Sequence, residues 1–173
     1  RTVTFDYDAI TRSTDVTDEH GQVTSYRYDD KGQLLSIATP PIDGTRLLTF
    51  FSYDADGNLI SKKDSANKVS HYQYDSRGNL LTSIDAKGRR IDRRYNSDDQ
   101  LIAEIRYRDI DPDGIGAAMP TEALVTRYIY DDNKDLRFVV NADGSVSQHI
   151  YNSLGQKSDA YTYLQDSYNV INI

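Results

Sequence analysis

The chain of 173 residues contains no cysteine and no tryptophan, only one methionine and only four prolines. The absence of cysteine excludes disulfides, thiol catalysis and cysteine-ligated zinc sites. No apolar run approaches the roughly 20 residues that a membrane-spanning helix needs, so the sequence predicts no membrane span. The hydrophobic fraction is 38%, which favours a single-layer or curved sheet over a dense two-layer sandwich.

The sequence also has fewer basic than acidic residues. It contains 20 Lys and Arg and 27 Asp and Glu, which gives a formal net charge of −7. We therefore expect neither nucleic acid nor anionic lipid as a partner. One basic run stands out, and it is either a solvated strand face balanced by nearby Asp residues or a binding patch for an acidic partner. It consists of Arg89, Arg90, Arg93 and Arg94.

Sequence motifs of catalytic, metal-binding and phosphate-binding sites are likewise missing. No two histidines share metal-ligand spacing, no serine lies in a nucleophile-elbow context, and no glycine loop of the phosphate-binding kind occurs. The abundant carboxylates recur at turn positions, which explains them as turn formers. The sequence therefore predicts that the chain is not an enzyme.

Tyrosine, by contrast, is abundant, with 14 residues. Seven of them anchor copies of one recurring phrase: Tyr7, Tyr28, Tyr53, Tyr74, Tyr95, Tyr130 and Tyr151. By subtraction, their spacings are 21, 25, 21, 21, 35 and 21 residues. A fixed period near twenty residues indicates a repeat architecture.

One unit is predicted to contain a strand, a turn, a second strand and a second turn, as residues 72–94 illustrate. Tyr72 and Tyr74 share one face of a strand of period two. The next four residues begin with Asp and end with Gly, which is type I turn chemistry, because Asp bonds the backbone ahead and Gly accepts a left-handed conformation. Alternation in the second strand is expected to place the following residues on one face: Leu80, Thr82 and Ile84.

The second turn recurs at Asp18–Gly21, Asp64–Asn67, Asp85–Gly88 and Asn141–Gly144. Turn residues at this density leave no room for the apolar stripe of a helix. The predicted fold class is therefore all-β, with tandem 21-residue β-hairpin repeats in a curved antiparallel sheet. Tyrosines on alternate strands, about 9–10 Å apart, are expected to form a ladder of core residues. The alternative is a row of sugar-stacking aromatics on an open face.

The recurring phrase resembles the Tyr-Asp-x-x-Gly-x-Leu signature of the Rhs/YD repeat family. Three copies match in full, two lose the Gly, and one has Lys in place of Leu; the first copy, at Tyr7, has neither the Gly nor the Leu. The signature residues are Tyr28, Asp29, Gly32 and Leu34; Tyr53, Asp54, Gly57 and Leu59; Tyr74, Asp75, Gly78 and Leu80; Tyr95 and Leu101; Tyr130 and Leu136; and Tyr151 and Gly155. The resemblance covers nearly the whole chain.

The resemblance implies a scaffold, because Rhs and YD repeats form β-sheet ribbons that spiral into hollow shells around a toxin domain in bacterial Rhs and Tc-type toxins, with similar shells in teneurins. It implies a secreted or cell-surface bacterial protein. The expected partners are neighbouring repeats of a longer parent chain or an enclosed domain, together with edge-strand self-association. The chain begins within a repeat, so we expect it to be part of something longer, and too short to close a shell alone.

A single repeat array is expected to occupy residues 1–173. Its parts are regular units at 28–52, 53–73 and 74–94, an insertion at 106–125, regular units at 126–157, and a degenerate end or cap at 158–173.

The insertion carries Asp109, Asp111 and Asp113 at alternate positions, followed by Gly114. Calcium loops place hard oxygen ligands in this way, although the Glu expected at the twelfth position is replaced by Pro120. The insertion is therefore either a calcium loop or a polar loop, and no other cofactor is expected.

The sequence as a whole leaves two functions open. The first is a structural segment that scaffolds or encapsulates another domain. The second is a glycan- or protein-binding module of a bacterial surface adhesin, assisted by calcium.

Overall fold

The computed structural model describes residues 2–164, and these residues form a sheet of 14 strands. The strands are β1 (Thr4–Asp8), β2 (Ser13–Thr17), β3 (Val23–Tyr28), β4 (Leu34–Ala38), β5 (Leu48–Tyr53), β6 (Leu59–Lys63), β7 (Val69–Tyr74), β8 (Leu80–Ile84), β9 (Arg90–Tyr95), β10 (Leu101–Tyr107), β11 (Ala123–Tyr130), β12 (Leu136–Val140), β13 (Val146–Tyr151) and β14 (Lys157–Tyr163).

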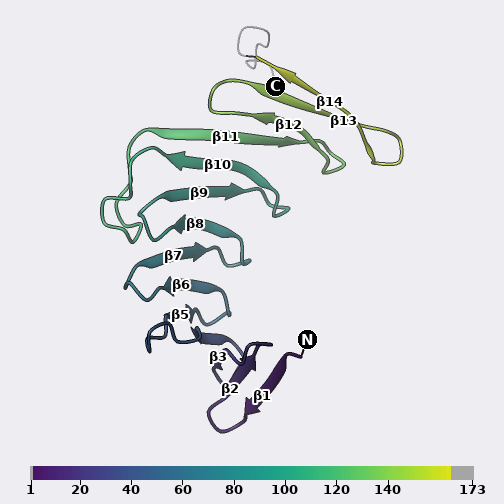
Figure 1. The fold of residues 1–173 in the computed structure, drawn as a ribbon. Helices are drawn as coiled ribbons and strands as arrows, with labels where there is room; N and C mark the ends of the chain where they lie inside the picture. The colour runs from purple at the N-terminus through teal and green to yellow at the C-terminus, as the bar shows by residue number, and fades with distance from the viewer. Residues whose placement is uncertain (1, 165–173) are drawn as a thin grey trace.

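Each strand pairs antiparallel with the next strand in the sequence, from β1 to β14. Figure 1 shows the resulting ribbon bent into an open arc, with β1 and β14 at opposite ends. Tyr53, Tyr74 and Tyr95 end the alternate strands β5, β7 and β9. The predicted fold class is confirmed, and these three tyrosines lie on alternate strands of one sheet as predicted. The last residues of the predicted cap, 165–173, lie outside the described residues, whereas residues 157–163 form β14.

Side-chain hydrogen bonds hold the tight turns in the predicted way. In the turn after β7, Asp75 Oδ1 accepts the backbone N–H groups of Arg77 and Asn79, each at 2.9 Å. Gly78 closes the turn at φ +86°. Asp99 and Lys134, which replace the signature Gly, adopt the same left-handed conformation at φ 60° and 69°. The turn therefore forms without Gly. Its backbone is strained there, because a residue with a side chain disfavours positive φ.

These turn carboxylates predict a dependence of stability on pH. Hydrogen bonds from the Asn58 and Asn79 side chains, and then from backbone N–H groups, lower the pKa of Asp54 and Asp75 below the ordinary value of 3.8. A pKa that folding lowers contributes stability above the unfolded value, and this stability is lost as the pH falls through the folded value. We therefore expect the Tm to fall as the pH drops below about 4.

The matched variant is the double substitution Asp54→Asn, Asp75→Asn. Asn is a suitable replacement, since Asn96 and Asn152 accept the same pair of backbone N–H groups in their own turns. Thermal unfolding from pH 7 to pH 2.5 should show little change at neutral pH and a shallower loss in acid. An acid branch as steep as that of the parent chain would refute this role for the two carboxylates.

A β-bulge follows the anchor tyrosine in six of the seven hairpins. In the β7–β8 hairpin Tyr74 pairs with Leu80, yet Gln73 pairs with Thr82, so one extra residue lies on β8. The extra residue breaks the alternation of side chains along the strand. The prediction that Leu80 shares a face with Thr82 and Ile84 is therefore wrong: Leu80 lies on the face of Tyr74, and the other two lie on the opposite face.

Four anchor tyrosines bond to the bulge of the unit before them. The Tyr95 hydroxyl donates to the Leu80 carbonyl at 3.2 Å. The same bond links Tyr53 to Leu34, Tyr130 to Leu101 and Tyr151 to Leu136, each at 3.0 Å. A bulge disrupts the hydrogen-bond ladder locally, and the hydroxyl of the next unit supplies a donor there. At these four positions the tyrosine hydroxyl has a structural role that Phe could not fill.

Removing one of these hydroxyls should destabilise the sheet. Tyr95→Phe leaves the partly buried Leu80 carbonyl without its donor, which costs about 1–3 kcal/mol of unfolding free energy. Tyr72→Phe is the control, because the Tyr72 hydroxyl makes no hydrogen bond within residues 2–164. Urea unfolding should show a lower midpoint for the first variant only, and equal midpoints would contradict the role of the bond.

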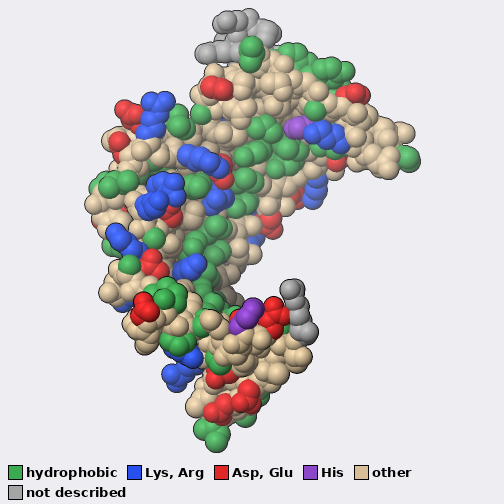
Figure 2. All heavy atoms as spheres, in the orientation of Figure 1, with side chains coloured by type: hydrophobic (Ala, Val, Ile, Leu, Met, Phe, Trp, Pro, Cys, Tyr) green, Lys and Arg blue, Asp and Glu red, His purple; other side chains and the backbone are tan. Residues whose placement is uncertain are grey.

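The apolar core is thin. Among the described residues only Ile84 and Val146 are buried hydrophobic side chains, at 1% and 0% exposure. The anchor tyrosines from Tyr28 to Tyr151 are half-buried, and burial raises the pKa of Tyr53, Tyr74 and Tyr130. Figure 2 shows hydrophobic side chains, a class that includes tyrosine, gathered along the inner side of the arc. A single curved layer of this kind gains its stability mostly from contacts between neighbouring units.

Candidate functional site

The predicted insertion is a loop over residues 108–122, because β10 and β11 extend into the range 106–125 from both sides. The loop folds back onto the sheet beside Arg90, whose side chain is only 7% exposed. Its Nη1 donates to the carbonyls of Gly116 at 3.1 Å and Ala118 at 3.0 Å. The same atom lies 3.3 Å from Asp111 Oδ2, and the Asp111 side chain is fully buried. Arg90 is therefore the point at which the insertion docks. We call this contact the Arg90 cluster.

Two residues of the sheet complete the Arg90 cluster. Asp92 lies two positions along β9 and accepts Arg90 Nε at 2.9 and 3.1 Å. The Tyr107 hydroxyl donates to Asp92 Oδ2 at 2.7 Å, and the Arg90 guanidinium lies 5.9 Å from the centre of the Tyr107 ring. Burial and the Asp92 carboxylate together raise the pKa of Tyr107 to about 12. Burial acts to lower the pKa of Arg90, but its bonds to Asp92 and Asp111 raise it overall. Arg90 is therefore positively charged at neutral pH, and its Nε and Nη1 both donate within the cluster.

The three predicted calcium ligands have different protein partners. Asp111 bonds to Arg90, Asp109 accepts the Thr121 hydroxyl, and Asp113 accepts the backbone N–H groups of Ile115 and Ala118 at 2.9 and 2.6 Å. The Ile115 N–H, followed by the Asp111 side chain and further backbone donors, lowers the pKa of Asp113 to about 2. Within residues 2–164, no group of three acidic or histidine side chains is arranged to hold a metal ion. Calcium binding remains a prediction.

The structure corrects the interpretation of the basic run, which does not form one solvated face. Arg90 faces the insertion, whereas Arg93 lies on the other face, bonds to Ser83 Oγ at 3.3 Å and pairs with Glu104 at 3.2 Å. Arg89 is exposed and pairs with Asp85 at 2.6 Å. The available signal in the sequence was the Arg-x-Asp spacing, which places Arg90 and Asp92 on the same face of a strand. Nothing in that spacing identified Asp111 as the third member.

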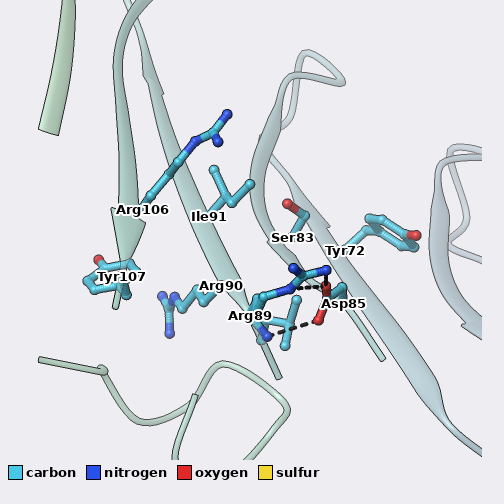
Figure 3. Close-up of a pocket in the computed structure, with 9 residues that line it drawn as sticks. Tyr72, Ser83, Asp85, Arg89, Arg90, Ile91, Arg106 and Tyr107 are labelled. Atoms are coloured by element: carbon cyan, nitrogen blue, oxygen red, sulfur yellow. Dashed lines mark hydrogen bonds and ion pairs between the residues drawn. The ribbon is translucent and has the colours of Figure 1, made fainter. Parts of the chain in front are cut away.

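A pocket of about 450 Å³ lies over β7–β10. Its floor is a cross-strand row in which each residue pairs with the next: Tyr72, Ser83, Ile91 and Arg106. Figure 3 shows this row from one strand to the next, with the Arg89–Asp85 pair at its rim. Arg106 is 67% exposed and is anchored by Glu104 at 2.8 Å. The Ser83 hydroxyl, the Tyr72 ring and the exposed Arg106 guanidinium line this pocket, and together they can bind a polar ligand.

Comparison with known proteins identifies the repeat. The RHS Repeat family model matches residues 7–40 and 53–90. These two stretches are therefore RHS repeats, as their signature residues predicted. No curated protein matches the chain.

The solved structures similar to this chain include two assemblies that contain TccC3. The crystal structure of TcdB2-TccC3-Cdc42 is 11% identical with a TM-score of 0.27, over 96% of this chain and 14% of that chain. The Tc holotoxin pore of Photorhabdus luminescens, carrying a mutation in TccC3, is 12% identical with a TM-score of 0.32, over 90% of this chain and 13% of that chain. This chain thus spans a small fraction of the proteins it matches. Among the described residues no helix has the length and apolar character to cross a bilayer.

Proposed function

We propose that this chain is a structural segment of a large secreted or cell-surface bacterial protein, in which its hairpins form part of a shell or stalk that scaffolds or encloses another domain. Residues 1–173 form one array in this proposal. The natural partners are the neighbouring repeats of the parent chain or the enclosed domain, and the sheet edges β1 and β14 are where further strands pair.

One observation carries the proposal: the hydrogen bonds that the signature side chains make lie within the repeat array itself. The anchor Tyr bonds to the preceding unit, the Asp holds its own turn, and the Gly closes that turn at positive φ. These bonds end on backbone atoms of the sheet and its turns. A residue kept for ligand chemistry would instead present its polar atoms to a cavity.

The test removes a unit from the parent protein in two ways. Deleting residues 74–94 takes out one whole period, so Tyr95 takes the place of Tyr74 and every later junction keeps its register. Deleting residues 74–84 takes out one turn and the single strand β8, so every later strand runs in the direction opposite to the one its position in the sheet requires. We expect the first deletion to preserve protection of the enclosed region against protease and the second to abolish it. Equal protection in both would contradict a scaffold built from units.

The pocket over β7–β10 favours a second candidate, a binding module for glycans or a protein partner. Tyr72 and Arg106 offer a stacking surface and an exposed cation beside Ser83. Glycan-array screening and calorimetry on the intact chain test this function, with Tyr72→Ala and Arg106→Ala as site variants and Tyr26→Ala as the matched aromatic control. Binding that both site variants weaken, and the control does not, would favour the module over the scaffold.

Calcium assistance is tested separately. If Asp109, Asp111 and Asp113 hold the ion, millimolar calcium should raise the Tm, and Asp113→Asn should reduce the rise. Because Asp111 already pairs with Arg90, binding would require the insertion to rearrange. An unchanged Tm at millimolar calcium would exclude the calcium loop.

A further inference from the structure

Two exposed arginines lie on one face of the sheet, on either side of a single alanine. Ala103 of β10 pairs directly with Arg94 of β9 and with Arg127 of β11. The three strands lie side by side (Figure 1), and directly paired residues point to the same face. The Cα atoms of the two arginines are therefore about 9–10 Å apart, which is twice the spacing between strands. We call these three residues the two-arginine site.

Within residues 2–164, neither Arg94 nor Arg127 forms an ion pair or a hydrogen bond, and both side chains are exposed. The other arginines of residues 85–140 each pair with a carboxylate: Arg89, Arg90, Arg93, Arg106, Arg108 and Arg137. Asp92, which shares the face of Arg94 on β9, is already bonded to Arg90, Thr82 and Tyr107. The two arginines left over are the two that Ala103 separates.

The same cross-strand triplet occurs in the preceding units, where its side chains bond to one another. These triplets are Ser52, Ser61 and His71, and Gln73, Thr82 and Asp92. The hydroxyls of Ser52 and Ser61 are 2.6 Å apart, and Thr82 Oγ1 donates to Asp92 Oδ1 at 2.9 Å. Ala103 has no side chain that can bond, and two cations cannot satisfy each other across it. An anion between the two guanidinium groups would complete this triplet.

Two guanidinium groups match a doubly charged oxyanion better than they match a carboxylate. Each guanidinium presents a planar fork of N–H donors that binds two oxygens at once. A carboxylate has one charge and two oxygens, so a single arginine satisfies it. A phosphate group carries a charge of about −1.5 to −2 at pH 7 and offers three strong acceptor oxygens. It can therefore engage both forks together.

A hollow of about 570 Å³ adjoins Arg127. Val125 and Val140 line it on the face of the two arginines, and the Asn141–Gly144 turn forms its rim. Val140 pairs directly with Arg127, so the hollow continues the row of the two-arginine site. Asp143 on the rim presents a carboxylate that can accept hydroxyl groups. A molecule bound through its phosphate group has room here for a small hydroxylated body.

We propose that the two-arginine site binds a phosphate group, either as the free ion or as the monoester of a small hydroxylated molecule, with Arg94 and Arg127 on opposite sides of it. None of the bonds that join successive units involves these two side chains, so this inference goes beyond the scaffold and does not depend on it. Binding should weaken as the pH falls below about 6, because a phosphate monoester then loses its second charge.

NMR titration of the intact chain at constant ionic strength tests the proposal, with inorganic phosphate, glycerol 3-phosphate and acetate as probes. We expect both phosphates to cause saturable shifts in the amide signals of residues around Ala103, and acetate to cause none. Arg94→Gln and Arg127→Gln should each weaken phosphate binding about tenfold. Tighter binding of glycerol 3-phosphate would place its glycerol in the hollow, and equal binding would assign the site to the phosphate group alone.

Arg27→Gln is the matched control. Arg27 is also exposed and pairs with Ser36 at the corresponding place in its own triplet, but Phe50 and not a second cation lies across from it. The substitution removes the same charge from the chain and should leave the shifts around Ala103 unchanged. An equal loss of binding in Arg27→Gln would mean that phosphate responds only to net charge, which would overturn the proposal.

Ala103→Glu supplies the anion from the chain itself. A carboxylate between the two arginines should abolish phosphate binding and raise the Tm, because opposite charges directly across a strand pair stabilise it. Shifts that do not saturate, affinity that survives both arginine substitutions, or phosphate binding retained by Ala103→Glu would each overturn the proposal. Any of these results would leave the scaffold proposal standing, since that proposal depends on the unit deletions in the parent protein.

Discussion

Arg90→Leu should release the insertion from the sheet. The substitution removes the cation that faces Asp111, whose side chain is fully buried, and Asp92, whose side chain is 14% exposed. Leaving buried charge uncompensated costs about 3–5 kcal/mol. The insertion can avoid that cost by undocking, which returns Asp111 to water. We therefore expect rapid protease cleavage within residues 108–122 and a lower Tm, with the β-sheet circular dichroism largely kept.

The neighbouring Arg89→Leu is the matched control. Arg89 is 68% exposed and pairs with Asp85 at the surface, where an ion pair is worth at most about 1 kcal/mol. Adding Asp111→Leu to Arg90→Leu should slow the cleavage again, because an apolar pair replaces the stranded charge. If Arg90→Leu and Arg89→Leu were cleaved at the same rate, the Arg90 cluster would not be what holds the insertion.

Ile84→Ala should give the largest loss among the apolar side chains, because Ile84 is 1% exposed and the insertion covers it. A Cβ added at Gly116 would lie only 3.1 Å from Ile84 Cδ1, which shows how closely the loop approaches. Truncating a buried Ile to Ala costs about 2–5 kcal/mol. Urea unfolding should show this loss, and Ile60→Ala, at 37% exposure, should show less than half of it.

The size of the Ile84 effect should depend on the insertion. In a chain whose residues 108–122 are replaced by a four-residue turn like Asp85–Gly88, Ile84 is open to solvent and Ile84→Ala should cost little. The difference between the two backgrounds measures the coupling between loop and sheet. An equal loss with and without the loop would show that Ile84 is buried by the sheet alone.

The repeat made most of the fold predictable, because the same local chemistry recurs many times. Tyr74 at a strand end, Asp75 at the start of a turn and Gly78 at positive φ each follow from conformational preferences that hold without tertiary contacts. Asp99 and Lys134 show the limit of that argument, since the flanking strands impose the turn where the favourable residue is missing. The turn is then determined by the sheet and not by its own sequence.

What could not be predicted depends on contacts between units. The bulge at Leu80 leaves no mark in the alternation of residues, so its effect on the faces of β8 was missed. The pairing of Arg90 with Asp111 joins residues 21 positions apart in sequence, and no period relates them because the insertion breaks the repeat. Which of many aspartates reaches a given arginine is decided by the path of the loop. The site was therefore less predictable than the fold.

Disulfide mapping of the unit junctions tests the central claim most directly, because the chain has no cysteine of its own. Directly paired residues on neighbouring strands have Cα atoms about 4.5–5.5 Å apart, within reach of a disulfide. Ser61→Cys with His71→Cys, and Thr82→Cys with Asp92→Cys, should each crosslink rapidly under mild oxidation. The shifted pairs, Ser61→Cys with Tyr72→Cys and Thr82→Cys with Arg93→Cys, point to opposite faces and should not. Equal crosslinking of matched and shifted pairs, or none in either, would show that the units do not stack in one register.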